Sequence, residues 1–257
     1  MRIGVVAPGR SVTPELAARL RAVAAAAFPE VELHIHPQCF ASAGHFAGDD
    51  AVRAAAFVAV ANDPAIDAVW FARGGYGAFR ILDAALPRLA SAAADKLYLG
   101  YSDAGSLLGG LYAKGVGRVA HGPMPADLGR AGGEAAVLRA LAYLARGDRA
   151  ALEPSLGTAP AAAFNLTILA HLIGTPYLPD LSGHVLMVEE VSEAVYRIDR
   201  DLGQMMSARA LGGIAGLRLG RCVDVTPNDP EFGCDEAAAA AAWCARAGVP
   251  WLGRADI

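Results

Sequence analysis

Residues 94–115 read "ADKLYLGYSDAGSLLGGLYAKG". A short apolar run ends at Gly100, Ser102 and Asp103 follow at once, and a run with helical spacing begins at Ala104. This order predicts a strand, a tight turn and a helix. Ligands of open α/β sheets bind beyond the carboxyl ends of the strands. The turn therefore places Ser102 where such folds carry their chemistry.

The same alternation of strand and helix extends through the first half of the chain. The predicted strands are residues 2–8, 31–37, 65–72, 96–101 and 117–123, and the predicted helices are residues 13–27, 49–62 and 104–114. Near-continuous apolar strands that alternate with helices indicate a parallel sheet covered on both faces. We therefore expect an α/β domain over residues 1–147.

The pattern changes after Arg146. Residues 148–162 have loop composition and are interpreted as a linker to a second domain at 163–257. The second region is predicted to hold helices at 165–174, 194–208 and 235–248, and strands at 183–191, 212–222 and 249–257. A chain of 257 residues is long enough for two such domains.

Composition excludes several classes of protein. Hydrophobic residues make up 54% and charged residues 19%, so we expect a globular chain with a large core. A net charge of −4 without a polybasic stripe argues against nucleic acid or an anionic membrane as a partner. The longest uncharged stretch, 156–178, contains Pro160, Asn165 and Pro176 and is interpreted as core rather than a membrane span. Four cysteines without a CxxC pair indicate reduced thiols in the cytoplasm.

Two interpretations of Ser102 compete. A serine on a tight strand-to-helix turn stands clear of the sheet, near backbone N–H groups that stabilise an oxyanion, which suits a nucleophile. Ser102 or Asp103 would equally serve as the cap of the following helix. Spacing alone favours the cap, and the turn is not the GxSxG of common esterases.

A second candidate stretch, "ARGGYGAFRIL", begins at Ala72. Gly74 and Gly75 let backbone N–H groups face a ligand, and Arg73 adds a fixed positive charge. The spacing is neither GxGxxG nor that of a phosphate loop, so we expect no dinucleotide cofactor. The alternative is a plain glycine turn with Arg73 in a surface ion pair.

The third stretch ends a strand with two adjacent acids, Glu189 and Glu190. Side-chain alternation sends them to opposite faces, so one can face a cleft and orient a histidine. The alternative is an exposed pair of acids that opens the next helix. The histidines show no metal spacing such as HExxH, and we expect no metal. His121 ends a strand close to Ser102 in sequence.

Several stretches together resemble one family, the LD-carboxypeptidases, which are serine peptidases that trim muropeptides and include the microcin C self-immunity peptidases. The stretches are "RGGYGAFRIL", "LGYSDAGSLLGGLYAKG", "HGPM", "FNLTILAHLIGTPYLPDLSGHVLMVEEVSEAVYRIDRDLGQM" and "VPWLGRADI". They occur in the expected order and extend the resemblance from Val5 to Ile257. Their specificity outweighs the cap interpretation of Ser102.

The resemblance implies a fold and a site. The fold is a flavodoxin-like parallel-sheet α/β domain joined to a smaller C-terminal α/β domain, with the active site between them. Ser102 matches the nucleophile and Glu189 the triad acid, and the oxyanion donors match the N–H groups of Asp103 and Gly75. Members release a terminal D-alanine from a muropeptide without a metal, as cytoplasmic homodimers.

The chain departs from the family pattern at two places. Ala163-Phe164-Asn165 stands where many members have Gly-Gly-Asn. The family's catalytic histidine follows a stretch that "GRADI" matches, so the resemblance places it just past Ile257. We do not expect His121 to replace it, because its family position is structural. The leading interpretation is a serine LD-carboxypeptidase; the alternatives are a hydrolase of peptide–nucleotide antibiotics and a non-catalytic muropeptide-binding protein.

Overall fold

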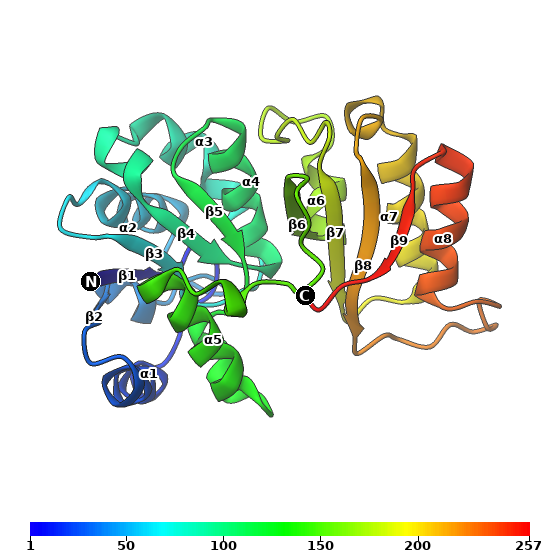
Figure 1. The fold of residues 1–257 in the computed structure, drawn as a ribbon. Helices are drawn as coiled ribbons and strands as arrows, with labels where there is room; N and C mark the ends of the chain where they lie inside the picture. The colour runs from blue at the N-terminus through cyan, green and yellow to red at the C-terminus, as the bar shows by residue number, and fades with distance from the viewer. The chain divides into compact units, whose positions relative to one another are not determined.

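A computed structural model describes residues 1–257, which form two compact units, Met1–Leu152 and Glu153–Ile257. Each unit has its own parallel β-sheet with helices between successive strands (Figure 1). The predicted α/β fold class is confirmed. Residues 148–162, which the sequence analysis interprets as a linker, contain a single 3₁₀ turn at Arg149–Ala151 before the second sheet begins.

The sheet of the first unit has five parallel strands in the order β2-β1-β3-β4-β5. The strands are β1 (Arg2–Val6), β2 (Glu32–Ile35), β3 (Ala68–Phe71), β4 (Leu97–Gly100) and β5 (Arg118–His121). This is the flavodoxin-like order expected from the resemblance. All five strands fall within the predicted ranges, because each is a short apolar run bounded by turn residues.

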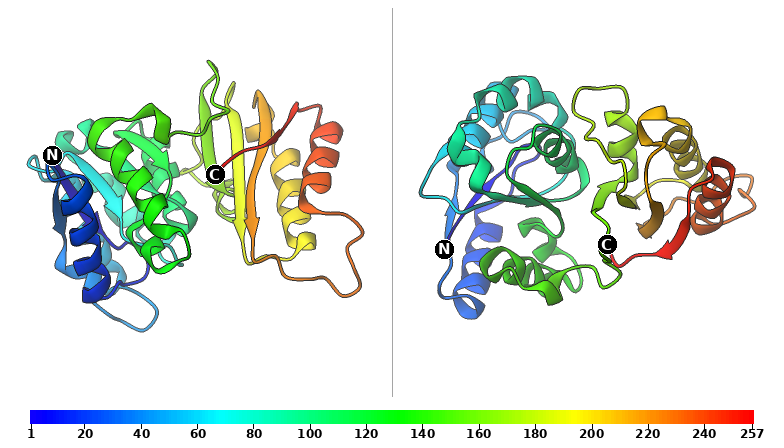
Figure 2. Two further views of the ribbon diagram at one scale, coloured as in Figure 1. Left: turned by 60° about the horizontal axis from the view of Figure 1, so that its bottom comes forward. Right: turned by 45° about the horizontal axis from the view of Figure 1, so that its top comes forward.

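Helices cover both faces of this sheet (Figures 1 and 2). They are α1 (Pro14–Ala27), α2 (Asp50–Asn62), α3 (Leu82–Ala85), α4 (Gly105–Ala113) and α5 (Gly133–Arg146). Helices α1 and α5 pack with the sheet residues Ile3 and Trp70 in one core cluster. On the other face Phe57 of α2 contacts the rings of Phe71 and Tyr98 at 6.0 and 6.2 Å. Burial on both faces explains why the strands lack an alternating polar pattern.

Helix starts follow local capping chemistry. The Thr13 hydroxyl accepts a hydrogen bond from the Leu16 N–H at 3.2 Å, and the Asp49 carboxylate accepts one from the Val52 N–H at 2.8 Å. These bonds satisfy N–H groups that an uncapped helix leaves open. The longest helices have 14 residues, and no helix combines the length and apolar composition that a membrane span requires.

The second unit has a four-stranded parallel sheet in the order β6-β7-β8-β9. The strands are β6 (Ala161–Asn165), β7 (Val185–Val191), β8 (Gly216–Val223) and β9 (Trp251–Arg254), and the helices are α6 (Leu166–Leu172), α7 (Val195–Ser207) and α8 (Glu236–Ala247). Each strand is added on the same side of the one before it. Right-handed crossovers therefore place all three helices on one face, as Figure 2 shows.

Strand β6 was not predicted, and the loop assignment of its residues was wrong. Residues 161–165 read AAAFN, and alanine has a weak preference for strands. The segment nevertheless pairs with β7 over its whole length, from Ala161 with Val185 to Asn165 with Glu189. Pairing with a neighbouring strand, rather than local preference, determines its conformation.

Candidate active site

Four loops leave the carboxyl edge of the first sheet, after β1, β3, β4 and β5. The loop after β1 packs directly on the loop after β3, because a β-carbon at Gly9 would overlap the carbonyl oxygen of Gly75. The Ala126 N–H, in the loop after β5, donates a hydrogen bond to the Ala72 carbonyl at 3.0 Å. These contacts gather the predicted serine turn and glycine turn at one edge.

Ser102 has the backbone geometry of a nucleophile turn. Its φ is +58°, in the left-handed region that non-glycine residues rarely adopt, and Tyr101 before it is extended. The 3₁₀ turn Ser102–Ala104 then leads directly into α4. Strained backbone of this kind costs about 1–3 kcal/mol and concentrates at functional sites.

The cap interpretation of Ser102 and Asp103 is wrong. The residue that precedes α4 is Ala104, and no side chain caps the helix. No side-chain cap bond is present at the preceding 3₁₀ turn either. Helix capping therefore does not explain why a serine occupies the strained position.

Gly74 and Gly75 form the surface on which Ser102 rests. A β-carbon at Gly74 would lie 2.8 Å from Ser102 Oγ and 2.9 Å from Ser102 Cβ, closer than side-chain packing permits. Gly75 has a φ of +95°, which favours glycine. The predicted glycine turn and the predicted serine turn are thus in contact.

Asp103 connects the two turns. It is buried, and its Oδ2 accepts a hydrogen bond from the Ala78 N–H at 2.7 Å. Burial raises the pKa of this carboxyl, while the N–H groups of Ala78 and Gly77 oppose that rise. Its side chain is therefore used to fix the loop after β3, and its N–H as an oxyanion donor remains a prediction.

Arg53 is the largest contribution to this edge that the sequence analysis missed. Its side chain is fully buried in α2, where Nη1 donates to the Gly77 carbonyl at 2.7 Å and also to the Pro8 carbonyl. Nε donates to the Gly48 carbonyl at 3.2 Å, and Asp50 forms the ion pair that compensates the charge. A single arginine in the apolar run "AVRAAAFVAV" was the available signal.

Arg73 is not part of a surface ion pair, so that alternative is wrong. The residue is half-buried, and Nη1 donates to the Ser11 carbonyl at 3.1 Å. It therefore connects the loop after β3 to the loop after β1, and its positive charge stays at the edge that carries Ser102.

His121 and Tyr101 lie on neighbouring strand ends with ring centroids 5.9 Å apart. The residue is half-buried but its Nδ1 is enclosed, and burial lowers the pKa of His121 to about 4. An imidazole with so low a pKa is a weak base at neutral pH. This agrees with the structural role expected for His121.

In the second unit, Glu190 is a structural clamp. Its carboxylate accepts hydrogen bonds from Asn165 Nδ2 at 2.8 Å, from the Thr167 N–H at 2.9 Å and from Thr167 Oγ1 at 2.7 Å. The Val191 N–H donates a further bond at 2.8 Å. Glu190 therefore holds the start of α6 against β7.

Glu189 projects from the opposite face of β7, since side chains alternate along a strand. Both acids are only 4% exposed, so the alternative of an exposed acid pair is wrong. Opposite Glu189 the register slips, because Val188 pairs with Leu219 and Glu190 with Cys222. The bulge leaves an extra β8 residue across from Glu189, and bulges of this kind redirect side chains beside active sites.

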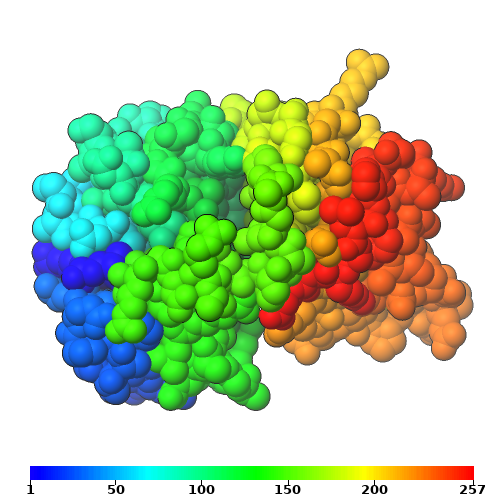
Figure 3. Space-filling view, in the orientation of Figure 1, coloured from blue at the N-terminus to red at the C-terminus, as the bar shows by residue number.

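The segment "GRADI" runs along β8 beside this bulge. The Ala255 N–H donates to the Leu219 carbonyl, and the Arg221 N–H donates to the Ile257 carbonyl, both at 3.0 Å. A β-carbon at Gly220 would overlap the Ile257 side chain. Figure 3 shows these C-terminal residues in red along the surface of the second unit.

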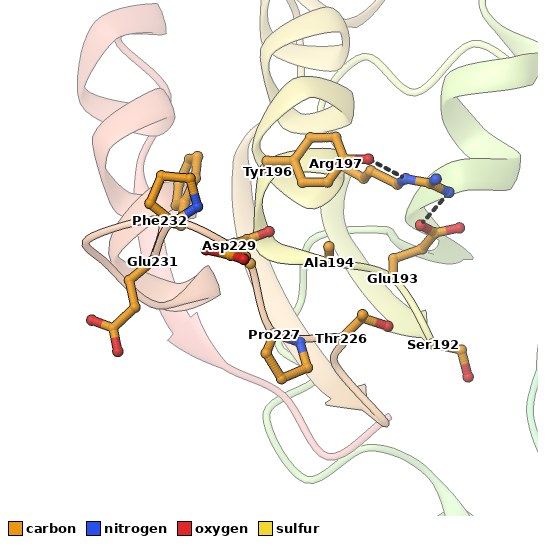
Figure 4. A pocket seen from close by; sticks show the side chains of 12 residues that line it. Ser192, Glu193, Ala194, Tyr196, Arg197, Thr226, Pro227, Asp229, Glu231 and Phe232 are labelled. Carbon is orange, nitrogen blue, oxygen red and sulfur yellow. Dashed lines mark hydrogen bonds and ion pairs between the residues drawn. The ribbon is translucent and has the colours of Figure 1, made fainter.

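A separate hollow of about 670 Å³ lies in the second unit, where the loops after β7 and β8 approach the start of α7 (Figure 4). Arg197 donates from Nε to the Tyr196 hydroxyl at 2.9 Å and from Nη1 to Glu193 at 3.1 Å. Neither Glu189 nor Glu190 lines the hollow. Its charged groups are paired with each other, and it carries none of the predicted site residues.

Comparison with characterised proteins agrees with this architecture. A carboxypeptidase-family relative from Streptomyces coelicolor is 35% identical over 195 residues, which cover 72% of this chain and 63% of the relative. The murein tetrapeptide carboxypeptidase of Pseudomonas aeruginosa is 29% identical over 238 residues, covering 83% of this chain and 75% of that protein. The matched segment thus spans less than two thirds of the Streptomyces relative.

The crystal structure of muramoyltetrapeptide carboxypeptidase from Oxalobacter formigenes superimposes with a TM-score of 0.82 at 26% identity, covering 98% of this chain and 87% of that one. Residues 3–122 match the LD-carboxypeptidase N-terminal domain, and residues 159–257 match the LD-carboxypeptidase C-terminal domain. The two matches fall one in each unit. The chain therefore belongs to the LD-carboxypeptidase family.

Proposed function

We propose that this protein is a serine carboxypeptidase that removes the terminal D-alanine from murein tetrapeptides. The observation that carries the proposal is the left-handed backbone of Ser102 on a strand-to-helix turn, in contact with Gly74. Relatives that act on murein tetrapeptides support the substrate class. An expensive backbone conformation at a serine that caps nothing is best explained by nucleophilic catalysis.

In the proposed reaction Ser102 Oγ attacks the carbonyl carbon that precedes D-alanine. The Ser102 proton passes to a base, and the carbonyl oxygen becomes an oxyanion that accepts hydrogen bonds from the N–H groups of Asp103 and Gly75. The C–N bond then breaks, and the D-alanine nitrogen takes the proton. Water hydrolyses the acyl-serine ester and restores the hydroxyl. Each oxyanion donor in such sites contributes about 10²–10³-fold to the rate.

The buried groups of the first unit keep these donors in place. The Asp103 carboxylate binds the Ala78 N–H, and Arg53 binds the Gly77 carbonyl, so the segment after Gly75 is held from two sides. Donors that are already oriented need no reorganisation during the reaction. The strain at Ser102 is thus maintained by neighbours with strong hydrogen bonds.

The base is an imidazole that Glu189 orients, as the acid of a serine triad does. The family pattern assigns that imidazole to a histidine following the Gly253–Ile257 segment. Glu190, whose oxygens already accept four hydrogen bonds, is not the orienting acid. We also propose a cytoplasmic homodimer; four free thiols suit a reducing compartment.

The test is D-alanine release from the murein tetrapeptide by the full-length protein. Ser102→Ala is expected to lower kcat at least about 10³-fold, as loss of a triad member does. Ser91→Ala, at an exposed serine of the same unit, is the matched control and keeps full activity. Undiminished release by Ser102→Ala would refute the assignment.

Binding separates the main alternative. Calorimetric titration of the tetrapeptide into wild-type and Ser102→Ala protein is expected to give similar affinities. If both proteins bind the tetrapeptide and neither releases D-alanine over hours, the protein is a muropeptide-binding protein rather than a peptidase.

A further inference from the structure

Three arginines converge on the turn that carries Ser102. Arg10 follows β1, Arg73 follows β3, and Arg130 follows the 3₁₀ turn Pro125–Gly129 beyond β5. They come from three different loops of the same sheet edge. The resemblance places only Arg73 beside the glycine turn, so Arg10 and Arg130 are additions from the structure.

Arg10 lies over the glycine turn. A β-carbon at Gly75 would lie 2.9 Å from Arg10 Cγ and closer still to Cδ, so the arginine stem covers the α-carbon of Gly75. The preceding residue, Gly74, is in contact with Ser102 in the same way. Consecutive α-carbons are only about 3.8 Å apart. The stem of Arg10 and the side chain of Ser102 thus pack against neighbouring residues of one turn.

The guanidinium of Arg10 is available for a ligand. The residue is exposed and makes no hydrogen bond or ion pair within the protein. An arginine with its donors open and its stem fixed by packing is suited to bind a carboxylate with two parallel hydrogen bonds.

Arg73 and Arg130 place further positive charge nearby. Burial lowers the pKa of Arg73, and the positive charges of Arg10 and Arg130 lower it further, which shows that the three groups repel one another. Arg130 donates to the Tyr101 hydroxyl at 2.7 Å, and Tyr101 directly precedes Ser102. A bound anion relieves such repulsion.

The acids close to this cluster do not neutralise it. Asp103 is turned into the protein toward the Ala78 N–H. Asp127 accepts from the Tyr101 hydroxyl at 2.8 Å and the Met124 N–H at 2.7 Å, and it pairs with Arg130 at 3.3 Å. Asp127 therefore compensates Arg130, while Arg10 and Arg73 keep their charge.

We propose that Arg10, supported by the charge of Arg73, binds the free carboxylate of the terminal residue that the enzyme releases. The proposal rests on the proposed function, because a carboxypeptidase must distinguish a chain end from an internal bond. The carboxylate of the departing residue lies one residue from the carbonyl that Ser102 attacks. Arg10 is thus a specificity-determining residue for free chain ends.

The experiment compares two substrates that differ only at this group, the tetrapeptide with a free D-alanine carboxylate and the same peptide ending in D-alaninamide. Arg10→Gln is expected to lower kcat/KM for the free acid about 10- to 100-fold, the range for loss of a charge-assisted hydrogen bond. For the amide we expect a change below about 3-fold. Arg10→Lys keeps the charge without the paired geometry, and is expected to lie between wild type and Arg10→Gln.

Arg118→Gln is the matched control, since Arg118 is exposed and starts β5 at the opposite edge of the sheet. It should leave both substrates unaffected. An equal loss for acid and amide in Arg10→Gln, or no loss for either, overturns the inference while leaving the peptidase assignment intact.

Binding keeps the two proposals separable if the full-length protein releases no D-alanine. The acid and the amide are then titrated into Ser102→Ala and Ser102→Ala/Arg10→Gln proteins. Tighter binding of the acid that Arg10→Gln abolishes supports the carboxylate site even though the peptidase proposal has failed. Equal affinity for acid and amide in Ser102→Ala overturns the carboxylate site.

Discussion

Gly74 lies so close to Ser102 that a β-carbon at position 74 would be 2.8 Å from the hydroxyl oxygen. Gly74→Ala is therefore expected to displace the Ser102 side chain and lower kcat about 100-fold, because a displacement of about 1 Å has an effect of that size. The free energy of unfolding should fall by only about 1–3 kcal/mol. D-alanine release and urea unfolding measure the two effects.

The control for this prediction is Gly129→Ala. A β-carbon at Gly129, which belongs to the same unit, would have no heavy atom of another residue within 4 Å. Its substitution should leave kcat unchanged. Equal losses in the two variants would mean that the effect is general to glycine replacement in this unit rather than specific to Ser102.

Ser102 itself offers a test of backbone strain. Left-handed backbone costs an L-residue about 1–2 kcal/mol, and glycine avoids that cost but loses about 0.5–1 kcal/mol of it to the greater freedom of the unfolded chain. Because φ at Ser102 is +58°, Ser102→Gly is expected to raise the free energy of unfolding by up to about 1 kcal/mol. Ser102→Ala should not raise it.

Both Ser102 variants should be inactive, so the comparison isolates strain from the loss of the hydroxyl. Chemical denaturation with the same probe for both proteins gives the difference. A Ser102→Gly protein that is less stable than Ser102→Ala would show that the turn is not strained at this residue.

The elements of this fold were predictable where the information is local. Strands such as β3 and helices such as α7 follow from short apolar runs and from helical spacing, and the turn at Ser102 follows from its place between them. Strand β6 was missed because its alanines acquire strand conformation only by pairing with β7. Its residues carry no periodic signal of their own.

The site was predictable in its residue types and not in its supports. The serine and glycine turns are visible as motifs, but the contact between Gly74 and Ser102 depends on how two loops pack. Arg53 and Arg10 reach that turn from segments distant in sequence, and the bulge opposite Glu189 arises from sheet register. Such features result from tertiary structure, which single-residue patterns do not encode.

Arg53 should matter for stability more than any exposed arginine. Arg53→Met leaves the Pro8, Gly48 and Gly77 carbonyls without their buried donor, and removing one partner from a buried charge network costs about 3–5 kcal/mol. Arg21→Met, at an exposed site on α1, is the control and should change stability by less than about 0.5 kcal/mol. Thermal unfolding of the two variants decides the question; similar melting temperatures would contradict it.

The two adjacent acids of β7 should separate stability from catalysis. Glu190→Gln places an amide group among the donors of Asn165 and Thr167, and is expected to lower the free energy of unfolding by about 3 kcal/mol. Glu189→Gln should change it by less than about 1 kcal/mol but lower kcat about 10⁴-fold, as amide replacement of a triad acid does. Kinetics of full-length protein and urea unfolding test both variants. A reversal of the pattern would exchange the roles of the two residues.

His121 should give the first unit a dependence on mild acid. Its pKa is lowered by burial from 6.5 to about 4, so below pH 6.5 the unfolded chain binds a proton that the folded chain does not. Stability from this group is therefore fully present above pH 6.5 and is lost as the pH falls toward 4, by up to about 3 kcal/mol. The difference between wild type and His121→Gln, measured by urea unfolding from pH 7 to pH 4, isolates the effect because other titrating groups cancel. Wild type should lose stability faster than His121→Gln over this range, and parallel curves would show that His121 is protonated equally in both states.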